Sequence, residues 1–357
     1  MMSTVDPLIT VLMPVHNGAE YLRASVESIL GQTFRDFELL VVNDGSTDGT
    51  PELLARFAAD DPRVRVIGGT TRLGFSGALN LGLTQARGAL IARMDADDIA
   101  LPDRLAVQSD FLLTFPEVGL CGGRVQAFGL RKGTFHCPPL TAEETLCYAL
   151  FDNPFAHPTI MLRRELVNRH GLQFDPAYCP SDDYELWSRC VRLFPCANIN
   201  RVLLHYRVHA RSMSEADWGE MDRLAARIAA RELAALGLPT DEATTRFHRN
   251  LGRGRCFPIR QREELIQCEE WLQTLITANA SRARYPAATF RRTAGDIWFR
   301  ACYHAGALGP WMFLRYAGSP LCRARRTSLK EWLALGRMAL NFNKKAQNTG
   351  GSRRLGG

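Results

Sequence analysis

Three carboxylates within four residues, Asp95, Asp97 and Asp98, follow a short apolar run that begins after Gly88. This run predicts a buried β-strand over 89–97. A strand that ends in Asp-Ala-Asp places two acidic side chains at the carboxyl edge of a sheet, where open α/β sheets bind ligands. Carboxylates this close repel one another unless a cation lies among them, and Mg²⁺ or Mn²⁺ prefers such oxygen ligands. The residues predict either a divalent metal site or a solvated acidic turn before a helix.

Two more acidic residues, Asp182 and Asp183, open a helix predicted over 181–193. The helix dipole favours acids at this end, so capping alone accounts for one of them. If the helix end faces the acidic strand end, one carboxylate becomes a candidate general base. His209 follows a strand predicted over 203–208. A lone histidine is more often structural than a ligand, but imidazole can join carboxylates around Mn²⁺.

Asp44 and Arg72 follow two other predicted strands, over 37–42 and 64–67. A carboxylate at Asp44, just before Gly45, can accept a hydrogen bond from a nucleobase N–H, or it can simply form the turn. Arg72 can pair with a phosphate. The two residues therefore indicate a nucleotide-binding edge without excluding an ordinary turn.

The elements that must position these residues alternate in type along the first third of the chain. Strands are predicted over 8–15, 37–42, 64–67, 89–97 and 118–128, with helices over 19–30, 74–86 and 102–115 and a further helix beginning near Thr47 or Asp48. This βαβ rhythm predicts an α/β fold with a mostly parallel sheet flanked by helices. The polar clusters after the strands then lie along one edge. Neither G-x-G-x-x-G after the first strand nor a P-loop sequence is present, which disfavours a dinucleotide site and a P-loop.

Beyond this region the pattern is less regular and then becomes helical. A helix over 140–150 and an extended stretch over 154–162, with His157 extended before Pro158, precede the 181–193 helix. Helices are predicted over 215–236, 261–278, 287–305 and 328–342. We therefore expect a domain over 1–213 and a helical, basic C-terminal region over 214–357.

Composition agrees with a folded protein of about two domains. Of 357 residues, 46% are hydrophobic and 23% charged, and no apolar run approaches the roughly 18 residues of a membrane span. No secretory signal is visible, and ten cysteines without a C-x-x-C pair suit reduced thiols, so a cytoplasmic location is expected. The net charge of +7 is uneven: residues 281–357 hold fifteen Lys and Arg against two acids, which leaves 7 − 13 = −6 for the rest. Such a tail favours an anionic partner surface.

Eight segments, taken in order over about residues 8–214, resemble the family 2 glycosyltransferases, which have a GT-A fold. Each is weakly specific alone, and their order makes the resemblance strong. The segments are Met13-Pro-Val-His-Asn-Gly18, Val42-Asn-Asp-Gly-Ser-Thr-Asp48, Arg72-Leu-Gly-Phe-Ser-Gly-Ala-Leu-Asn80, Met94-Asp-Ala-Asp-Asp98, Pro102-Asp-Arg-Leu105, His157-Pro158, Ser181-Asp-Asp-Tyr-Glu-Leu-Trp187 and Tyr206-Arg-Val-His209.

The resemblance implies an inverting, metal-dependent hexosyltransferase that uses a nucleoside-diphosphate sugar, a UDP-sugar foremost. It assigns substrate binding to Pro14, Val15, His16, Asn17, Asp44, Gly45, Arg72, Asp95, Ala96 and Asp182, metal binding to Asp97, Asp95 and His209, and the base to Asp183. Asp98 is expected only to cap or solvate the turn. Many relatives have Tyr where His16 stands, which leaves the base identity open, and many have Glu-Asp where Asp182-Asp183 stands. The absence of Q-x-x-R-W argues against a processive synthase.

Elementary chemistry agrees with these roles. Negative charge develops on the departing diphosphate, and a divalent ion (Mn²⁺ or Mg²⁺) can stabilise it. The acceptor hydroxyl must lose its proton as it attacks, which a single carboxylate on the opposite face of the sugar can accept. One base and in-line displacement invert the anomeric centre, whereas retention would need a second carboxylate as nucleophile.

The predicted helix over 328–342 lies outside the resemblance. Its apolar side, which includes Trp332, Leu333, Leu335 and Phe342, either packs on the rest of the protein or lies in a membrane interface with basic residues toward anionic lipid. The expected partners are a nucleotide sugar, a glycan or lipid-linked glycan acceptor and the inner face of the cell membrane, with no nucleic acid. Polysaccharide or glycolipid synthesis follows as the expected role.

Two other functions are compatible with an acidic strand end. A sugar-nucleotide nucleotidyltransferase would usually carry a basic, glycine-rich loop after the first strand, and here the first basic residue after that strand is Arg23. A non-catalytic, membrane-associated scaffold could keep the same fold. Asp183→Asn discriminates this scaffold from an enzyme.

Overall fold

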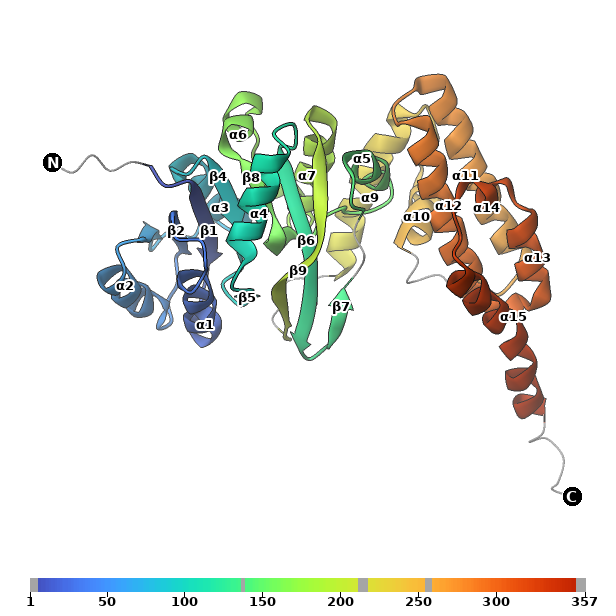
Figure 1. The fold of residues 1–357 in the computed structure, drawn as a ribbon, viewed down its shortest axis with the longest axis horizontal. Helices are drawn as coiled ribbons and strands as arrows, with labels where there is room; N and C mark the ends of the chain where they lie inside the picture. Colours follow the sequence, from blue (N-terminus) through green and yellow to red (C-terminus); the bar gives the residue numbers. More distant parts are fainter. Residues whose placement is uncertain (1–5, 136–138, 211–217, 254–258, 351–357) are drawn as a thin grey trace, which may run out of the picture. The chain divides into compact units, whose positions relative to one another are not determined.

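The computed structural model describes residues 6–135, 139–210, 218–253 and 259–350 (Figure 1). The chain divides into two compact units, a sheet unit of residues 1–149 and 153–228 and a helical unit of residues 150–152 and 229–357. The boundary predicted near 213 falls outside the described residues, and the division between the units comes after Ile228.

The sheet unit contains one nine-stranded sheet in the order β3-β2-β1-β4-β8-β6-β9-β5, with β7 paired to β6. Its strands are β1 (Ile9–Val15), β2 (Phe37–Asp44), β3 (Val64–Gly69), β4 (Leu90–Arg93), β5 (Ile99–Ala100), β6 (Leu120–Gly129), β7 (Gly133–Phe135), β8 (Met161–Arg163) and β9 (Cys196–Val208). The first four, β3-β2-β1-β4, are all parallel, as the βαβ rhythm predicts. Beyond β4 the sheet is mixed, because β8 is antiparallel to β4 and β6.

Helices cover both faces of this sheet and bury apolar side chains against it. On one face lie α1 (Ala19–Leu30), α2 (Thr50–Asp60) and α4 (Arg104–Thr114), and on the other α3 (Phe75–Gln85), α5 (Ala142–Tyr148), α6 (Arg164–His170) and α7 (Asp182–Leu193). Every residue of β1 is buried, which is typical of a central parallel strand covered on both sides. The sheet unit also contains the short 3₁₀ turns η1 (His157–Thr159) and η2 (Pro176–Tyr178), and helix α9 (Trp218–Ala235) continues past the division after Ile228.

The register of the parallel strands brings their carboxyl ends together. Val15 lies opposite Asn43, and Leu12 lies opposite Arg93, the last residue of β4. The segments after β1, β2 and β4 therefore leave the sheet at one edge, as expected for an open α/β sheet.

Three local predictions differ from the structure. The strand predicted over 89–97 ends at Arg93, because its ladder with β8 stops at Ala92 and the acidic residues turn away from the sheet. The last strand is longer than predicted, since β9 continues the parallel ladder with β6 from Cys196 onward. The extended conformation predicted for His157 is wrong: His157 begins η1, where its carbonyl accepts the N–H of Ile160 at 3.3 Å.

The helical unit contains α10 (Glu242–Arg253), α11 (Arg262–Arg282), α12 (Ala287–His304), η3 (Gly306–Leu308), α13 (Pro310–Gly318), α14 (Pro320–Ala324) and α15 (Leu329–Gly350). Its core is built from large side chains of several helices, including Leu272, Phe290, Trp298 and Tyr316, all fully buried. Among the described residues, no helix is both long enough and apolar enough to cross a bilayer.

Gly82 allows α3 to pack closely on the sheet. A Cβ at this position would lie 2.1 Å from Leu12 Cδ1, on the central strand β1. We expect Gly82→Ala to lower the free energy of unfolding by about 1–2 kcal/mol, because overpacking outweighs the better helix propensity of alanine. Urea unfolding followed by circular dichroism measures the change. Gly336→Ala is the control: its added Cβ would meet only Phe313, at 3.9 Å, and should be neutral or stabilising. Equal loss in both variants would contradict the packing argument.

Candidate active site

The carboxyl end of β4 gathers three acidic side chains. Oxygen atoms of Asp95, Asp97 and Asp98 all lie within 4.8 Å of one another. They converge because β4 ends at Arg93 and the chain turns before β5, which begins at Ile99. The structure thus forms the predicted acidic cluster, and it includes the third carboxylate as well.

Asp98 is fully buried, so the prediction that it caps or solvates the turn is wrong. Its Oδ1 accepts the backbone N–H of Arg207 at 2.8 Å, which ties the turn to β9. Burial raises the pKa of Asp98 well above its usual range, and repulsion from Asp95 and Asp97 adds to the rise. Its Oδ2 is buried without a hydrogen-bond partner among the described residues. Asp98 is therefore an inner member of the cluster.

Asp97 is held by residues near the end of β9. His209 Nε2 lies 2.9 Å from Asp97 Oδ2 and donates to this carboxylate, and the Arg207 side chain donates to the Asp97 carbonyl at 2.8 Å. The His209 ring packs on Tyr21, with their centroids 5.1 Å apart. The structure thus brings His209 to Asp97, and its role as a metal ligand stays a prediction. As a metal ligand through Nε2, however, His209 would have to release the proton that it donates here.

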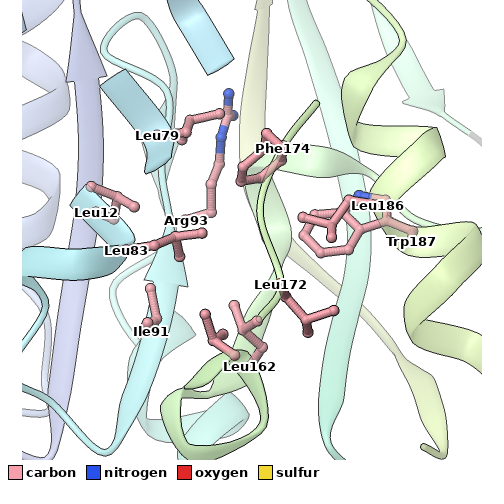
Figure 2. Close-up of a pocket in the computed structure, with 11 residues that line it drawn as sticks. Leu12, Leu79, Leu83, Ile91, Arg93, Leu162, Leu172, Phe174, Leu186 and Trp187 are labelled. Carbon is pink, nitrogen blue, oxygen red and sulfur yellow. The ribbon is translucent and has the colours of Figure 1, made fainter. Parts of the chain in front are cut away.

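Asp95 pairs with Arg93, a residue that the sequence prediction missed. The Arg93 side chain is only 4% exposed, and its guanidinium forms an ion pair with Asp95 and lies over the Phe75 ring, 5.4 Å from the centroid. Figure 2 shows it rising from β4 beside Leu79 and Phe174, above a small cavity lined by apolar side chains. The sequence could have indicated this role, because Arg93 ends an otherwise apolar strand. A charge buried there needs a partner of opposite charge.

The composition of the cluster fits a hard divalent cation. Carboxylate oxygens are the donors that Mg²⁺ and Mn²⁺ prefer, and burial together with mutual repulsion raises the pKa of Asp95 despite Arg93. A cation among the three side chains would relieve that repulsion. The orphaned Oδ2 of Asp98 points to the same need.

The start of α7 supplies the second acidic pair. Asp182 is buried and accepts a hydrogen bond from Ser76 Oγ on α3 at 2.5 Å. Asp183 Oδ2 accepts from the side-chain amide of Asn153 at 2.8 Å. The N-cap of this helix is Ser181, which makes no side-chain cap bond. Asp183 Oδ1 also accepts the Tyr184 N–H at 2.6 Å, so one of the two acids binds a backbone N–H of the first helical turn, as the capping prediction requires.

Burial, together with repulsion from the neighbouring Asp182, raises the pKa of Asp183 to about 7. The hydrogen bond from the Tyr184 N–H, the charge of Arg93 and the hydrogen bond from Asn153 act in the opposite direction. A carboxylate that titrates near neutral pH can accept a proton efficiently under physiological conditions. Arg93 therefore influences both acidic groups, since its charge also limits the rise in the pKa of Asp95.

The ends of β1 and β2 form the opposite part of the edge. His16 Nδ1 donates to the Asp44 carbonyl at 2.7 Å, and the Asp44 carboxylate accepts the backbone N–H of Leu73. The carboxylate thus holds the loop that carries Arg72, whose side chain is exposed. Gly45 has a φ of +66°, and a Cβ there would lie 3.1 Å from the Arg72 nitrogen, so the turn requires glycine.

The other predicted substrate residues take supporting places at this edge. Pro14 and Val15 are the buried last residues of β1, and Ala96 is half-buried within the acidic cluster. Asn17 has a φ of 51°, and its Oδ1 accepts the N–H of Thr47 at 2.8 Å. The structure brings His16, Asn17, Asp44 and Arg72 into one connected loop region.

Comparison with known proteins agrees with this geometry. The sequence model described as Glycosyl transferase family 2 matches residues 10–171. An uncharacterized glycosyltransferase of Haemophilus influenzae is 32% identical over 237 residues, 62% of this chain and 72% of the relative. The O-antigen biosynthesis glycosyltransferase WbnJ of Escherichia coli is 32% identical over 219 residues, 58% of this chain and 83% of the relative.

Solved structures share the fold. TarS 1-349 of S. aureus, solved in complex with UDP, superposes with a TM-score of 0.51 at 19% identity, covering 94% of this chain and 91% of that one. The mannosyltransferase PcManGT of Pyrobaculum calidifontis, in complex with GDP-Man and Mn²⁺, gives 0.50 at 19% identity, covering 96% and 88%.

The sheet and its neighbours define a glycosyltransferase with the GT-A fold. The chain belongs to the family 2 glycosyltransferases, as the relatives at 32% identity establish. This membership favours a sugar transferase over the nucleotidyltransferase considered from the sequence.

The raised pKa of Asp183 predicts a pH-dependent gain in stability for Asp183→Asn. The folded protein holds this proton up to about pH 7, whereas the unfolded chain releases it near pH 4, so ionisation destabilises the fold as pH rises through that window. Asp183→Asn should therefore raise the melting temperature by several degrees at pH 8 and little at pH 4. Asp110→Asn, an exposed change of equal charge, is the control. Equal gains at both pH values would contradict the shift.

Proposed function

We propose that the protein transfers a hexosyl group, with inversion, from a nucleoside-diphosphate sugar to a hydroxyl of a glycan or lipid-linked glycan. The observation that carries the proposal is the pairing of a carboxylate of raised pKa, Asp183, with an acidic cluster at the carboxyl ends of the same sheet. A single base and a cluster suited to a cation are what an inverting transferase requires.

Asp183 is the proposed base. The acceptor hydroxyl donates its proton to this carboxylate while its oxygen bonds to the anomeric carbon, and the bond from that carbon to the diphosphate breaks. The nucleoside diphosphate leaves with the bonding electrons. The Asn153 amide and the Tyr184 N–H, 2.8 Å and 2.6 Å from the carboxylate oxygens, keep Asp183 oriented throughout. One displacement from the opposite face inverts the anomeric centre.

Asp97 and Asp95 are the proposed metal ligands, with His209 as a third. A bound Mn²⁺ or Mg²⁺ would neutralise charge on the donor diphosphate. The ion pair with Arg93 keeps Asp95 in place. The hydrogen bond from the Arg207 side chain to the Asp97 carbonyl holds the backbone of Asp97. Arg72, exposed on its loop, is the residue proposed to pair with a phosphate of the donor. The Mn²⁺ named for the mannosyltransferase of the same fold supports this proposal without fixing the ion.

The nucleoside is proposed to bind between the ends of β1 and β2. Because a carbonyl oxygen can only accept a hydrogen bond, His16 must carry its proton on Nδ1. Its hydrogen bond to the Asp44 carbonyl holds the ring at this edge. UDP and UDP-GlcNAc are named for TarS and GDP-Man for the mannosyltransferase, so a UDP-sugar is our first choice and GDP the alternative.

Relatives named for O-antigen biosynthesis in Escherichia coli and amylovoran biosynthesis in Erwinia amylovora support a role in surface polysaccharide synthesis. The amylovoran relative is 31% identical over 204 residues, 56% of this chain and 76% of its own length. The acceptor is therefore proposed to be a growing glycan, free or carried on a lipid.

Asp183→Asn should lower the rate of sugar transfer by about 10²–10⁴-fold, because amide nitrogen and oxygen cannot accept the hydroxyl proton. For the wild type, kcat/KM should rise as pH increases through about 7, where Asp183 ionises. Release of nucleoside diphosphate from a panel of UDP- and GDP-sugars with Mn²⁺ or Mg²⁺ measures both effects. Transfer at near wild-type rate in this variant would refute the assignment of the base.

Asp97→Asn separates the metal site from the base. It should weaken the metal dependence of donor binding, measured by calorimetry with UDP or GDP at varied Mn²⁺, while the unsubstituted base keeps its pH profile. Asp110→Asn, exposed on α4, is the matched control. Unchanged metal dependence in the Asp97 variant would remove Asp97 from the proposed ligands.

The helical unit is proposed to bind the anionic inner face of the membrane through α15. Leu335 and Ala339 bury one side of this helix, whereas Leu329, Leu333 and Leu340 are 75%, 54% and 70% exposed. At 100° per residue these three leucines fall within about 40° of one another. They form an exposed leucine stripe, which is the pattern of a helix that lies in a lipid interface.

The charge around the leucine stripe favours anionic lipid. Lys330 and Arg337 are exposed along one flank of it. The two acidic residues of the stretch 281–340, Asp296 and Glu331, both pair with Arg325, and against eleven Lys and Arg they leave a surplus of 11 − 2 = 9 positive charges. Basic residues near an anionic bilayer contribute about 1 kcal/mol each. Phe342, predicted for the apolar side, lies outside the residues whose side chains are described.

Vesicle flotation tests the leucine stripe. The protein should float with vesicles that contain phosphatidylglycerol and not with pure phosphatidylcholine, and Leu333→Asp/Leu340→Asp should abolish this binding. Leu113→Asp, 63% exposed on α4 of the sheet unit, should leave binding intact. Binding that survives the double variant would overturn the proposal. A change from dimer to monomer in the variant would assign the face to a second copy instead.

A further inference from the structure

Asn153 lies between a backbone donor and the proposed base. Its Oδ1 accepts the N–H of Phe155 at 3.1 Å, and its Nδ2 donates to Asp183 Oδ2 at 2.8 Å. The oxygen and nitrogen of an amide are told apart by such partners. Because a backbone N–H can only donate, Oδ1 must face Phe155 and Nδ2 must face Asp183. The amide cannot flip without losing both hydrogen bonds.

We infer that Asn153 is a positioning residue of the reaction, which orients the Asp183 carboxylate and stabilises its ionised form. The inference rests on the proposed function, since it takes Asp183 as the base. Asp183 Oδ1 accepts the Tyr184 N–H at 2.6 Å, so both carboxylate oxygens are held and rotation of the group is blocked. Each oxygen keeps a second lone-pair direction for the acceptor hydroxyl.

The chain after Asn153 is fixed within the sheet unit. Asn198 Nδ2 donates to the Pro154 carbonyl at 3.0 Å, and the Thr159 hydroxyl donates to the Ala156 carbonyl at 2.7 Å. Phe155 is buried and packs edge-on against Trp187 of α7, with ring centroids 6.4 Å apart. The segment after Asn153 is therefore held against α7, the helix that carries the proposed base.

The three residues before Asn153 are held inside the helical unit by two adjacent residues of α10. His248 Nε2 donates to the Leu150 carbonyl at 2.9 Å. Arg249 Nη1 donates to the Phe151 carbonyl and to Asp152 Oδ1, both at 2.9 Å.

Both α10 side chains are almost fully buried, His248 at 0% and Arg249 at 1% exposure. The Trp271 indole donates to His248 Nδ1 at 3.1 Å, which leaves the histidine proton on Nε2. Buried, charge-assisted bonds of this kind resist local opening.

Asp152 and Asn153 are consecutive, so chain continuity alone carries this anchorage from the helical unit to the amide beside the base. Every hydrogen bond invoked lies within one unit. The inference therefore extends to α10, whose Arg249 acts on the reaction only through the placement of Asn153. The helical unit then serves the chemical step as well as any acceptor or membrane surface.

The pH profile of kcat/KM tests Asn153 through its acid limb, the low-pH side on which activity rises as Asp183 ionises. Removing a donor to the ionised base should move this limb to higher pH in Asn153→Ala, and Asn153→Asp should move it further, because a second charge beside Asp183 disfavours ionisation. We expect kcat to fall of the order of 10- to 100-fold in Asn153→Ala, with the donor KM unchanged. Calorimetric binding of UDP and circular dichroism show that each variant is folded.

Arg249→Met tests the anchorage, because methionine keeps much of the side-chain volume without its donors. It should lower kcat and move the acid limb in the same direction as Asn153→Ala. Trp271→Phe is the milder variant if Arg249→Met does not fold. A change confined to the acceptor KM in both would overturn the role of α10.

The outcomes separate this inference from the proposed function. An active Asp183→Asn removes the base and with it the reaction as proposed. An inactive Asp183→Asn, together with an unmoved acid limb in both Asn153 variants, would overturn the role of Asn153 alone.

Discussion

Repulsion among the carboxylates that follow β4 is the constraint on which the rest of the site depends. Asp95, Asp97 and Asp98 converge where a buried strand leaves the sheet. The fold tolerates them because Arg93 pairs with Asp95, His209 donates to Asp97 just after β9, and the Arg207 N–H of β9 donates to Asp98. The negative charge that these contacts leave uncompensated would attract a divalent cation. The proposed transfer from a nucleotide sugar uses such a cation.

The first half of the sheet could be predicted because its signals are local. β1 and β2 are continuous apolar runs that end in polar turns, and β1, β2, β3 and β4 pair in parallel through short helical crossovers. The edge that holds His16 and Asp44 follows from this arrangement alone. The order of the later strands could not be predicted, because β8 has only three residues and its neighbours depend on long-range antiparallel pairing.

The candidate site divides in the same way. Asp95 and Asp97 are predicted by residue type and by their place at the end of a strand, and the Asp182-Asp183 pair by its place at the start of a helix. The choice of Asp183 within that pair comes from the family resemblance. Arg93 and Asn153 are not predicted, because their importance comes from contacts across the sheet unit. A buried arginine or a loop asparagine has many structural uses, and only the partner in space distinguishes them.

The short piece of residues 150–152 belongs to the helical unit although the chain on both sides of it belongs to the sheet unit. An N-terminal fragment that ends near 213 or 228 would therefore contain residues 150–152 without their partners on α10. The C-terminal fragment would contain Arg249 without Phe151 and Asp152, which accept its hydrogen bonds. The two units are interleaved in sequence rather than modular. Exchanging one glycosyltransferase's helical unit for another by simple fusion would break this inserted piece unless residues 150–152 were exchanged with it.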